Sequence, residues 1–171
     1  MDPAREVSHW LHHLLQAFVA GRAALPLYMG LDAALFNRLL ASDPALASWQ
    51  PAGPALAAMQ LRAELLAMRQ HEWQQIRDLL LGHAAPGAAP LAEILAAGAL
   101  GFHHLWEDLG LACRPDLKRL MQDCFPSLER LNVQQMRWKK FFYRQLCQAG
   151  GEYVCRAPSC DECPERAACF E

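Results

Sequence analysis

Four cysteines stand close together in the last part of the 171-residue chain, where their thiolates could bind a metal. They are Cys155, Cys160, Cys163 and Cys169, in the pattern C-x4-C-x2-C-x5-C. Thiolates are soft ligands that suit zinc and iron–sulfur clusters. A structural zinc site usually has two short ligand pairs about a dozen residues apart, and this run has no such gap. The first three cysteines have the spacing of plant-type ferredoxins, which favours a cluster and leaves a zinc knuckle as the alternative.

Disulfide bonds are a third interpretation of these cysteines. They need an oxidising compartment, whereas the N-terminal residues show no cationic and apolar pattern of a signal peptide. Seven cysteines cannot all pair with one another. Pro158 and Pro164 each force a turn in the run, which suits a loop wrapped around one compact cluster. We therefore expect reduced thiols and a cytoplasmic protein.

Further candidate ligands lie earlier in the chain. Cys147 could be a fifth thiol beside the run. The adjacent His103 and His104 have two interpretations: polar residues at a helix end, or nitrogen ligands that complete or gate the cluster. His9 and His13 are four residues apart, but no third ligand is near them in the sequence, so we interpret both as surface histidines.

A basic and aromatic segment directly precedes the cysteine run. The spacing predicts a helix over 133–148, with Arg137, Lys140 and Arg144 along one cationic stripe. Such a stripe usually is a solvated face. Beside a thiolate-ligated cluster, it could also stabilise negative charge or attract an oxyanion or an acidic partner.

The composition indicates a helical, globular chain. Hydrophobic residues make up 53% of it, Ala and Leu dominate, and the net charge is −2. This charge balance does not favour nucleic-acid binding, and no apolar run approaches the roughly 18 residues of a membrane span. We predict one all-α domain of about six or seven helices, comprising residues 1–150, with residues 151–171 as a cluster-binding loop of the same domain.

The apolar periodicity predicts where these helices lie. The expected ranges are 2–20, 32–40, 55–81, 91–99, 115–124, 127–131 and 133–148. The range 91–99 is apolar on nearly every side, which predicts a buried helix. In the long helix 55–81, the residues expected to face the core are Leu61, Leu65, Met68, Trp73, Ile76 and Leu80. Cys113 and Cys124 have no partner spacing, and we interpret them as small inert hydrophobes.

Three motifs in this order resemble the NifQ family of nitrogen fixation. They are the His-Leu-Trp-x-Asp-Leu-Gly-Leu stretch of residues 104–111, the sequence M-R-W-K-K-F-F-Y-R-Q-L-C of residues 136–147, and the C-x4-C-x2-C-x5-C run. The resemblance covers about residues 90–171 and is more general before them. It implies an iron–sulfur protein that carries molybdenum, rather than an enzyme, and supplies it for synthesis of the iron–molybdenum cofactor of nitrogenase.

The resemblance also implies cofactors and partners. The cofactor would be a [4Fe–4S]-like cluster or a molybdenum–iron–sulfur cluster on the four cysteines. The implied partners are molybdate, the scaffold complex on which the cofactor is built, and dinitrogenase reductase. Molybdenum in high oxidation states accepts oxygen and nitrogen ligands, so Glu107 and Asp108 join the two histidines as candidate labile ligands. An electron-transfer or redox-sensing cluster domain and a zinc-stabilised interaction module remain as alternatives.

Overall fold

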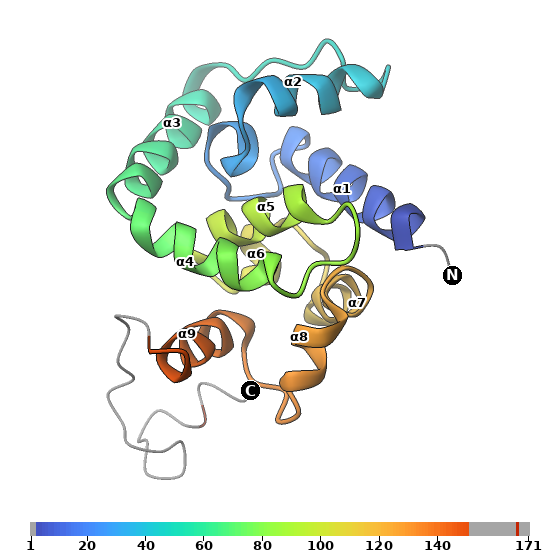
Figure 1. Ribbon diagram of the computed structural model, residues 1–171. Coiled ribbons are helices and arrows are strands. Elements are labelled where there is room, and N and C mark those ends of the chain that lie inside the picture. Colours follow the sequence, from blue (N-terminus) through green and yellow to red (C-terminus); the bar gives the residue numbers. More distant parts are fainter. Residues whose placement is uncertain (1–2, 151–166, 168–171) are drawn as a thin grey trace.

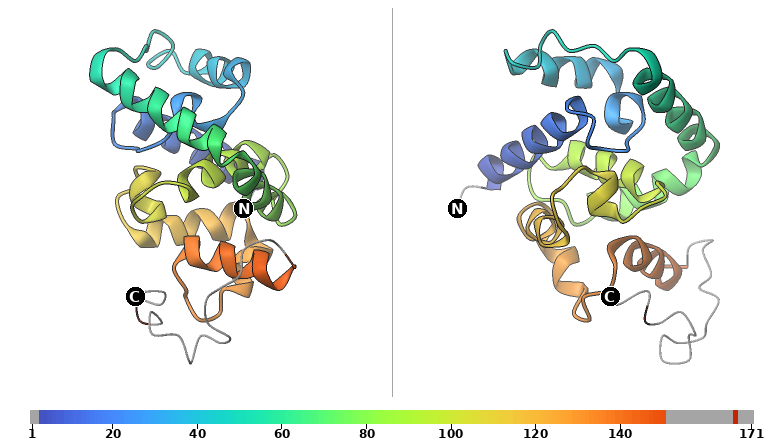
Figure 2. Two further views of the ribbon diagram at one scale, coloured as in Figure 1. Left: turned by 90° about the vertical axis from the view of Figure 1, so that its left-hand side faces the viewer. Right: turned by 180° about the vertical axis from the view of Figure 1, so that it is seen from behind.

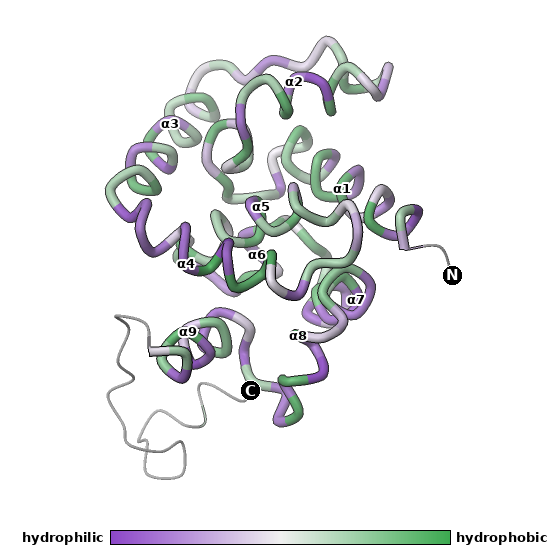
Figure 3. The backbone as a smooth tube through the Cα atoms, in the orientation of Figure 1, coloured by the Kyte–Doolittle hydropathy of each residue, from purple (hydrophilic) through white to green (hydrophobic). Residues whose placement is uncertain are grey.

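Helix α5 (Ala89–Ala99) lies in the middle of the molecule, and eight of its eleven residues are buried. It packs against α1 (Pro3–Val19), α4 (Gln70–Leu81) and α6 (Leu105–Asp108), as Figure 1 shows. Most of its residues are Ala, Leu, Ile or Gly, and its tube in Figure 3 is largely green. Apolar side chains on every side of a helix require neighbours on every side. This confirms the buried helix predicted over 91–99.

The computed structural model describes residues 3–150 and residue 167. These residues form nine α-helices, one 3-10 helix and no strand, which confirms the all-α class. The four cysteines of the predicted cluster loop lie outside the described residues. None of the helices within the described range is long and apolar enough to cross a bilayer. The remaining elements are η1 (Leu27–Gly30), α2 (Ala33–Ser42), α3 (Gly53–Met68), α7 (Arg114–Cys124), α8 (Pro126–Leu131) and α9 (Trp138–Gln148).

Local signals in the sequence explain several helix starts. The carboxylate of Asp32 caps α2 by accepting hydrogen bonds from the backbone N–H groups of Ala34, at 2.9 Å, and Leu35, at 3.1 Å. Pro115 and Pro126 occupy the first turns of α7 and α8, where a missing N–H costs nothing. These helices lie within one or two residues of their predicted ranges.

The single long helix predicted over 55–81 is wrong, because the chain breaks at Arg69. That residue has φ −111° and ψ 26°, which separates α3 from α4. Helix α4 then packs against α5, whereas α3 turns away to pack against η1. One straight helix over 55–81 could not make both the contact with η1 and the contact with α5. Together with the short helix α6, the break raises the helix number above the predicted six or seven.

The expected core face of that long helix is correct only in its second half. Trp73, Ile76 and Leu80 of α4 are buried. In α3, by contrast, Leu61 is 56% exposed and Met68 is 83% exposed, and Leu65 is also exposed. Green and purple alternate along α3 in Figure 3. The helix has no single apolar face, so periodicity could not identify the side that packs.

Helix α9 begins at Trp138, five residues later than the prediction of 133–148. The side chain of Asn132 closes the preceding loop by donating to the Met136 carbonyl at 2.9 Å and accepting from the Met136 N–H at 2.8 Å. Gln135 has φ 55°, a left-handed conformation that does not continue a right-handed helix. A buried asparagine thus replaces the expected first turn with a tight loop.

The C-terminal helices gather at one end of the molecule, with α2 at the opposite end, in all three views of Figures 1 and 2. Helix α9 packs on α4, and α7 packs on α1. The indole N–H of Trp10 in α1 donates to the carboxylate of Asp123 in α7 at 2.7 Å. Phe142 of α9 is fully buried, and burying a side chain of this size stabilises the fold by about 1.5–3 kcal/mol. These contacts position the start of α9 against the loop that carries the two histidines.

Candidate functional site

Residues 100–104 join α5 to α6 and carry His103 and His104, and we call this segment the histidine loop. A surface cleft of about 630 Å³ lies between the histidine loop and the start of α9. It unites two stretches that the sequence analysis singled out separately, namely His103 and His104 from the loop, and Arg137 and Lys140 from the start of α9. Its other lining residues are Phe102, Leu105, Trp106, Glu107, Arg114, Leu117, Trp138 and Lys139. The tertiary structure therefore produces one mixed basic and imidazole site.

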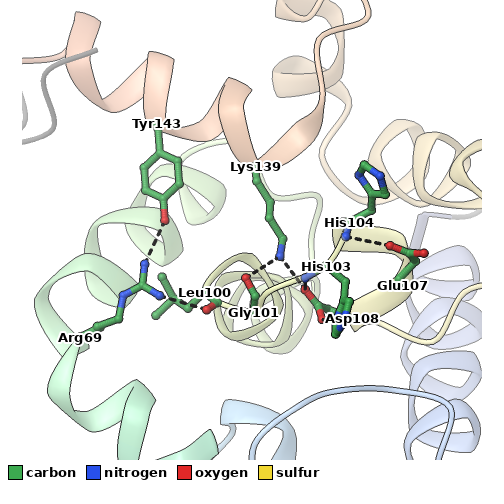
Figure 4. Close-up of polar contacts among 9 residues, drawn as sticks. All are labelled: Arg69, Leu100, Gly101, His103, His104, Glu107, Asp108, Lys139 and Tyr143. Carbon is green, nitrogen blue, oxygen red and sulfur yellow. Dashed lines mark hydrogen bonds and ion pairs between the residues drawn. The ribbon is translucent and has the colours of Figure 1, made fainter. Parts of the chain in front are cut away.

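Asp108 is a fully buried carboxylate that holds the two sides of this cleft together. Its Oδ2 lies 2.5 Å from Nζ of Lys139 on α9, and its Oδ1 lies 3.2 Å from Nδ1 of His103. Lys139 also donates to the carbonyl oxygen of Gly101 at 3.0 Å. Figure 4 shows the lysine reaching from α9 down to both partners. A buried carboxylate needs such partners because an isolated charge away from water is very costly.

Gly101 is the residue that makes room for this carboxylate. A Cβ atom at position 101 would lie only 2.6 Å from Cγ of Asp108, closer than side-chain atoms ever approach. The loop can therefore pass directly over the carboxylate only because residue 101 has no side chain. The glycine therefore has a packing role here.

The two histidines have different surroundings. The side chain of His103 is 66% exposed, and its Nδ1 contact with Asp108 leaves Nε2 as the nitrogen for a ligand. A carboxylate that orients a histidine ring in this way is common around metal-binding histidines. His104 caps α6 together with Glu107, whose carboxylate accepts from the His104 N–H at 2.9 Å. The His104 ring is exposed and lies parallel to Trp106, with ring centroids 6.5 Å apart.

Glu107 and Asp108 are already engaged inside the protein. Asp108 faces Lys139 and His103, and Glu107 caps the first turn of α6. A metal could take Asp108 only by displacing the lysine. The two imidazoles are therefore better placed than the two carboxylates to meet a ligand from the cleft.

The predicted cationic stripe is divided between two hollows. Arg137 and Lys140 line the cleft, whereas Arg144 lines a second hollow with Val133 and Gln145. The Arg144 guanidinium lies 3.4 Å from the side-chain oxygen of Gln134. Only two of the three predicted cations therefore share a site with the histidines.

Sequence reasoning missed two cations of the cleft, Lys139 and Arg114. Lys139 directly precedes Lys140, and neighbouring residues on a helix point about 100° apart, so the two lysines had to have different surroundings. That separation was the available signal for a buried lysine. Arg114 begins α7, and its Nη2 donates to the Gln135 carbonyl at 2.7 Å. No sequence signal indicated that it would face the start of α9.

A second polar cluster anchors the same face of α9, one turn further along the helix. Arg69, at the break between α3 and α4, forms two hydrogen bonds of 2.7 Å with the Glu72 carboxylate. Arg69 also donates to the Leu100 carbonyl at 3.0 Å. The hydroxyl of Tyr143 on α9 donates to Glu72 at 2.6 Å. Lys139 and Tyr143 are four residues apart, so α9 is held by one face at two points (Figure 4).

The thiols within the described range do not form a site of their own. Cys147 is half-buried in the last turn of α9, at the opposite end from the cleft. Cys124 is fully buried, and burial raises the pKa of its thiol to about 12, which confirms it as an inert hydrophobe. Cys113 is half-buried at the start of α7. Across residues 3–150, no three His, Cys, Asp or Glu side chains converge as metal ligands.

Of the two histidines of α1 that were interpreted as surface residues, His9 is exposed, whereas His13 is half-buried. The rings of His9 and His13 lie 6.2 Å apart, and His9 is exposed. Partial burial lowers the pKa of His13, with smaller contributions from His9 and Arg22.

The sequence matches the NifQ family model over residues 10–171, a range that includes both the cleft and all four clustered cysteines. The chain belongs to the NifQ family. The protein NifQ of Klebsiella pneumoniae is 48% identical over 167 residues, which is 95% of this chain and 97% of that protein. The NifQ of Azotobacter vinelandii is 42% identical over 94% of this chain and 86% of its own length.

A shorter match covers part of the chain. NifQ of Rhodobacter capsulatus is 50% identical over 100 residues, which is 57% of this chain and 56% of that protein. No solved structure matches the fold. The family resemblance seen in the sequence is thus confirmed, and it extends into the first 90 residues, where we had found only general similarity.

Proposed function

We propose that this protein is an iron–sulfur molybdenum carrier that supplies molybdenum for the iron–molybdenum cofactor of nitrogenase. The observation that carries the proposal is membership of the NifQ family, whose proteins take part in nitrogen fixation, over a match that includes the cysteine run. In this role the protein donates a metal and does not turn over a substrate. We place it in the cytoplasm.

The donor set fits a cluster by its chemistry. Cys155, Cys160, Cys163 and Cys169 provide four soft thiolates within one short stretch. Such a set suits an iron–sulfur cluster of the [4Fe–4S] kind. When bound, the cluster would supply the sulfide and iron to which molybdenum attaches, with molybdenum as the cargo. Cys147 is a candidate fifth thiol.

The described part of the chain supports a carrier through its cleft. Molybdenum must arrive and leave, and a surface cleft with exposed imidazoles and cations suits exchange better than a closed core does. His103 and His104 are candidate transient nitrogen ligands. Arg137 and Lys140 are candidate contacts for an anion or for an acidic partner surface. The proposed partners are the cofactor scaffold complex and dinitrogenase reductase.

Anaerobic purification followed by analysis for iron, sulfide, molybdenum and zinc tests this function. We expect broad visible absorption with all of iron, sulfide and molybdenum, lost in the Cys160→Ala/Cys163→Ala variant. Cys113→Ala is the matched control, because this cysteine lies outside the run, and it should keep the metal content. Iron and sulfide without molybdenum would favour an electron-transfer or redox-sensing domain. One zinc in a colourless protein would contradict the proposal.

A further inference from the structure

We propose that the cleft between the histidine loop and α9 is a binding site for a small tetrahedral oxyanion. The assigned contacts are Arg114, Arg137 and Lys140, with His103 and His104 at the rim. Taking molybdate as the physiological oxyanion rests on the proposed function. The anion site itself rests on the geometry and charge of the cleft.

The charge of the cleft differs from that of the whole chain. Four of its twelve lining residues are Lys or Arg and one, Glu107, is acidic, whereas the chain carries a net charge of −2. Buried Asp108 neutralises Lys139 from behind. None of the ion pairs found among the described residues involves Arg114 or Lys140. No ion pair within the described range therefore neutralises these two side chains, and their positive charge is available to an anion in the cleft.

The walls of the cleft strengthen this field. Leu117 and Trp138 are buried apolar side chains beneath the cations, and half-buried Trp106 forms a further wall. A concave surface with apolar walls and one sign of charge focuses the electric field and raises the local concentration of oppositely charged ligands. A cleft of about 630 Å³ has room for a small oxyanion together with bound water.

The cleft is also fixed in position. The contacts of Lys139 with Asp108 and with the Gly101 carbonyl attach the start of α9 to the histidine loop. The bond from Arg114 to the Gln135 carbonyl attaches α7 to the loop just before α9. Because these contacts fix the elements that carry the assigned residues, little backbone rearrangement is needed when the anion binds, which favours affinity.

Guanidinium and imidazole groups suit oxyanions for a further reason. Arginine presents several N–H donors in a planar fork that matches the oxygens of tetrahedral anions. A molybdenum oxyanion differs from sulfate and phosphate because its metal centre also accepts nitrogen ligands. The nearby His103 ring nitrogen could therefore separate molybdate from the other two anions.

Equilibrium dialysis of the full chain with molybdate, in parallel with sulfate and phosphate, tests this inference. We expect about one molybdate per chain at low salt, and an affinity that falls by about tenfold or more in Arg137→Gln/Lys140→Gln. Arg144→Gln is the matched control, since its side chain lines another hollow, and it should bind as the parent does. Circular dichroism verifies that each variant is folded.

Two results would overturn the anion site. One is unchanged molybdate affinity in the Arg137→Gln/Lys140→Gln variant. The other is complete loss of molybdate binding in Cys160→Ala/Cys163→Ala, because the oxyanion would then bind at the thiols. Retained molybdate binding in the cysteine variant supports the anion site in the cleft, even if the protein holds no iron and sulfide. Failure of the proposed carrier function can therefore be distinguished from failure of the anion site. Equal affinity for sulfate would support an oxyanion site but contradict molybdate as its physiological ligand.

Discussion

Nζ of Lys139 lies 2.5 Å from Oδ2 of Asp108, and this pair joins α9 to the loop that carries the histidines. Only 1% of the Asp108 side chain and 17% of the Lys139 side chain are exposed. The pair is thus a largely desolvated contact between two elements 31 residues apart in the sequence. It gives the cleft its shape without being part of the assigned anion contacts.

Lys139→Met should destabilise the protein strongly, by about 3 kcal/mol or more, since it leaves the Asp108 carboxylate buried without its cation. Urea unfolding followed by far-ultraviolet circular dichroism measures this change. The neighbouring Lys140→Met is the matched control, because Lys140 is exposed, and we expect a change within about 0.5 kcal/mol. Equal effects of the two substitutions would show that the pair contributes little.

Gly101→Ala should destabilise the fold by about 1–3 kcal/mol, because the added methyl group would collide with the Asp108 carboxylate. Gly82→Ala provides the comparison: there the new Cβ would lie 3.5 Å from its nearest neighbour, and the backbone has an ordinary φ of −62°. That variant should be neutral or slightly stabilised. Thermal unfolding of both proteins tests the difference, and a neutral Gly101→Ala would refute the close approach.

The pKa of His13 is lowered from its ordinary 6.5, mainly by burial, so the folded state resists protonation at this residue. The unfolded chain takes up the proton first as the pH falls below 6.5, which removes stability from the folded state. We expect the free energy of unfolding to fall less between pH 7.5 and pH 5.5 in His13→Gln than in the parent. Parallel slopes in the parent and in His13→Gln would contradict the role of His13.

Cys124 should resist alkylation in the folded protein, because its thiol is fully buried and has a pKa of about 12. Iodoacetamide treatment at pH 8, followed by peptide mass spectrometry, should modify half-buried Cys113 well before Cys124. Both residues should react readily in urea, which serves as the control. Rapid modification of Cys124 without denaturant would show that the core opens near the end of α7.

Removing the clustered thiols should leave the helical core intact. Within residues 3–150, the buried residues from Val7 to Leu146 form one hydrophobic core. Cys160→Ala/Cys163→Ala should therefore keep the far-ultraviolet circular dichroism of the parent while losing the metal that we propose these thiols hold. Anaerobic chelation of the parent protein should give the same result. A large loss of helix in either sample would mean that metal binding and folding of residues 3–150 are coupled.

Much of the fold follows from local signals in the sequence. Apolar residues on all sides placed α5 in the core, and the Asp32 cap and two first-turn prolines placed the starts of α2, α7 and α8. The break at Arg69 was not visible, because no glycine or proline lies between Ala55 and Leu81 to mark it. The late start of α9 depends on the buried Asn132 side chain, which hydrogen-bonds both backbone groups of Met136. These bonds form only in the folded loop, so the sequence pattern does not indicate them.

The sequence by itself determined which candidate ligand groups this protein carries, because four closely spaced thiols, paired histidines and a basic aromatic segment are covalent facts of the chain. It also determined the helical class and the family. The tertiary structure alone decided that His103 and Lys140 share a cleft, that Arg144 does not, and that Lys139 is buried against Asp108. The physical reason is that helical periodicity defines faces within one element, whereas which faces meet depends on the packing of distant elements.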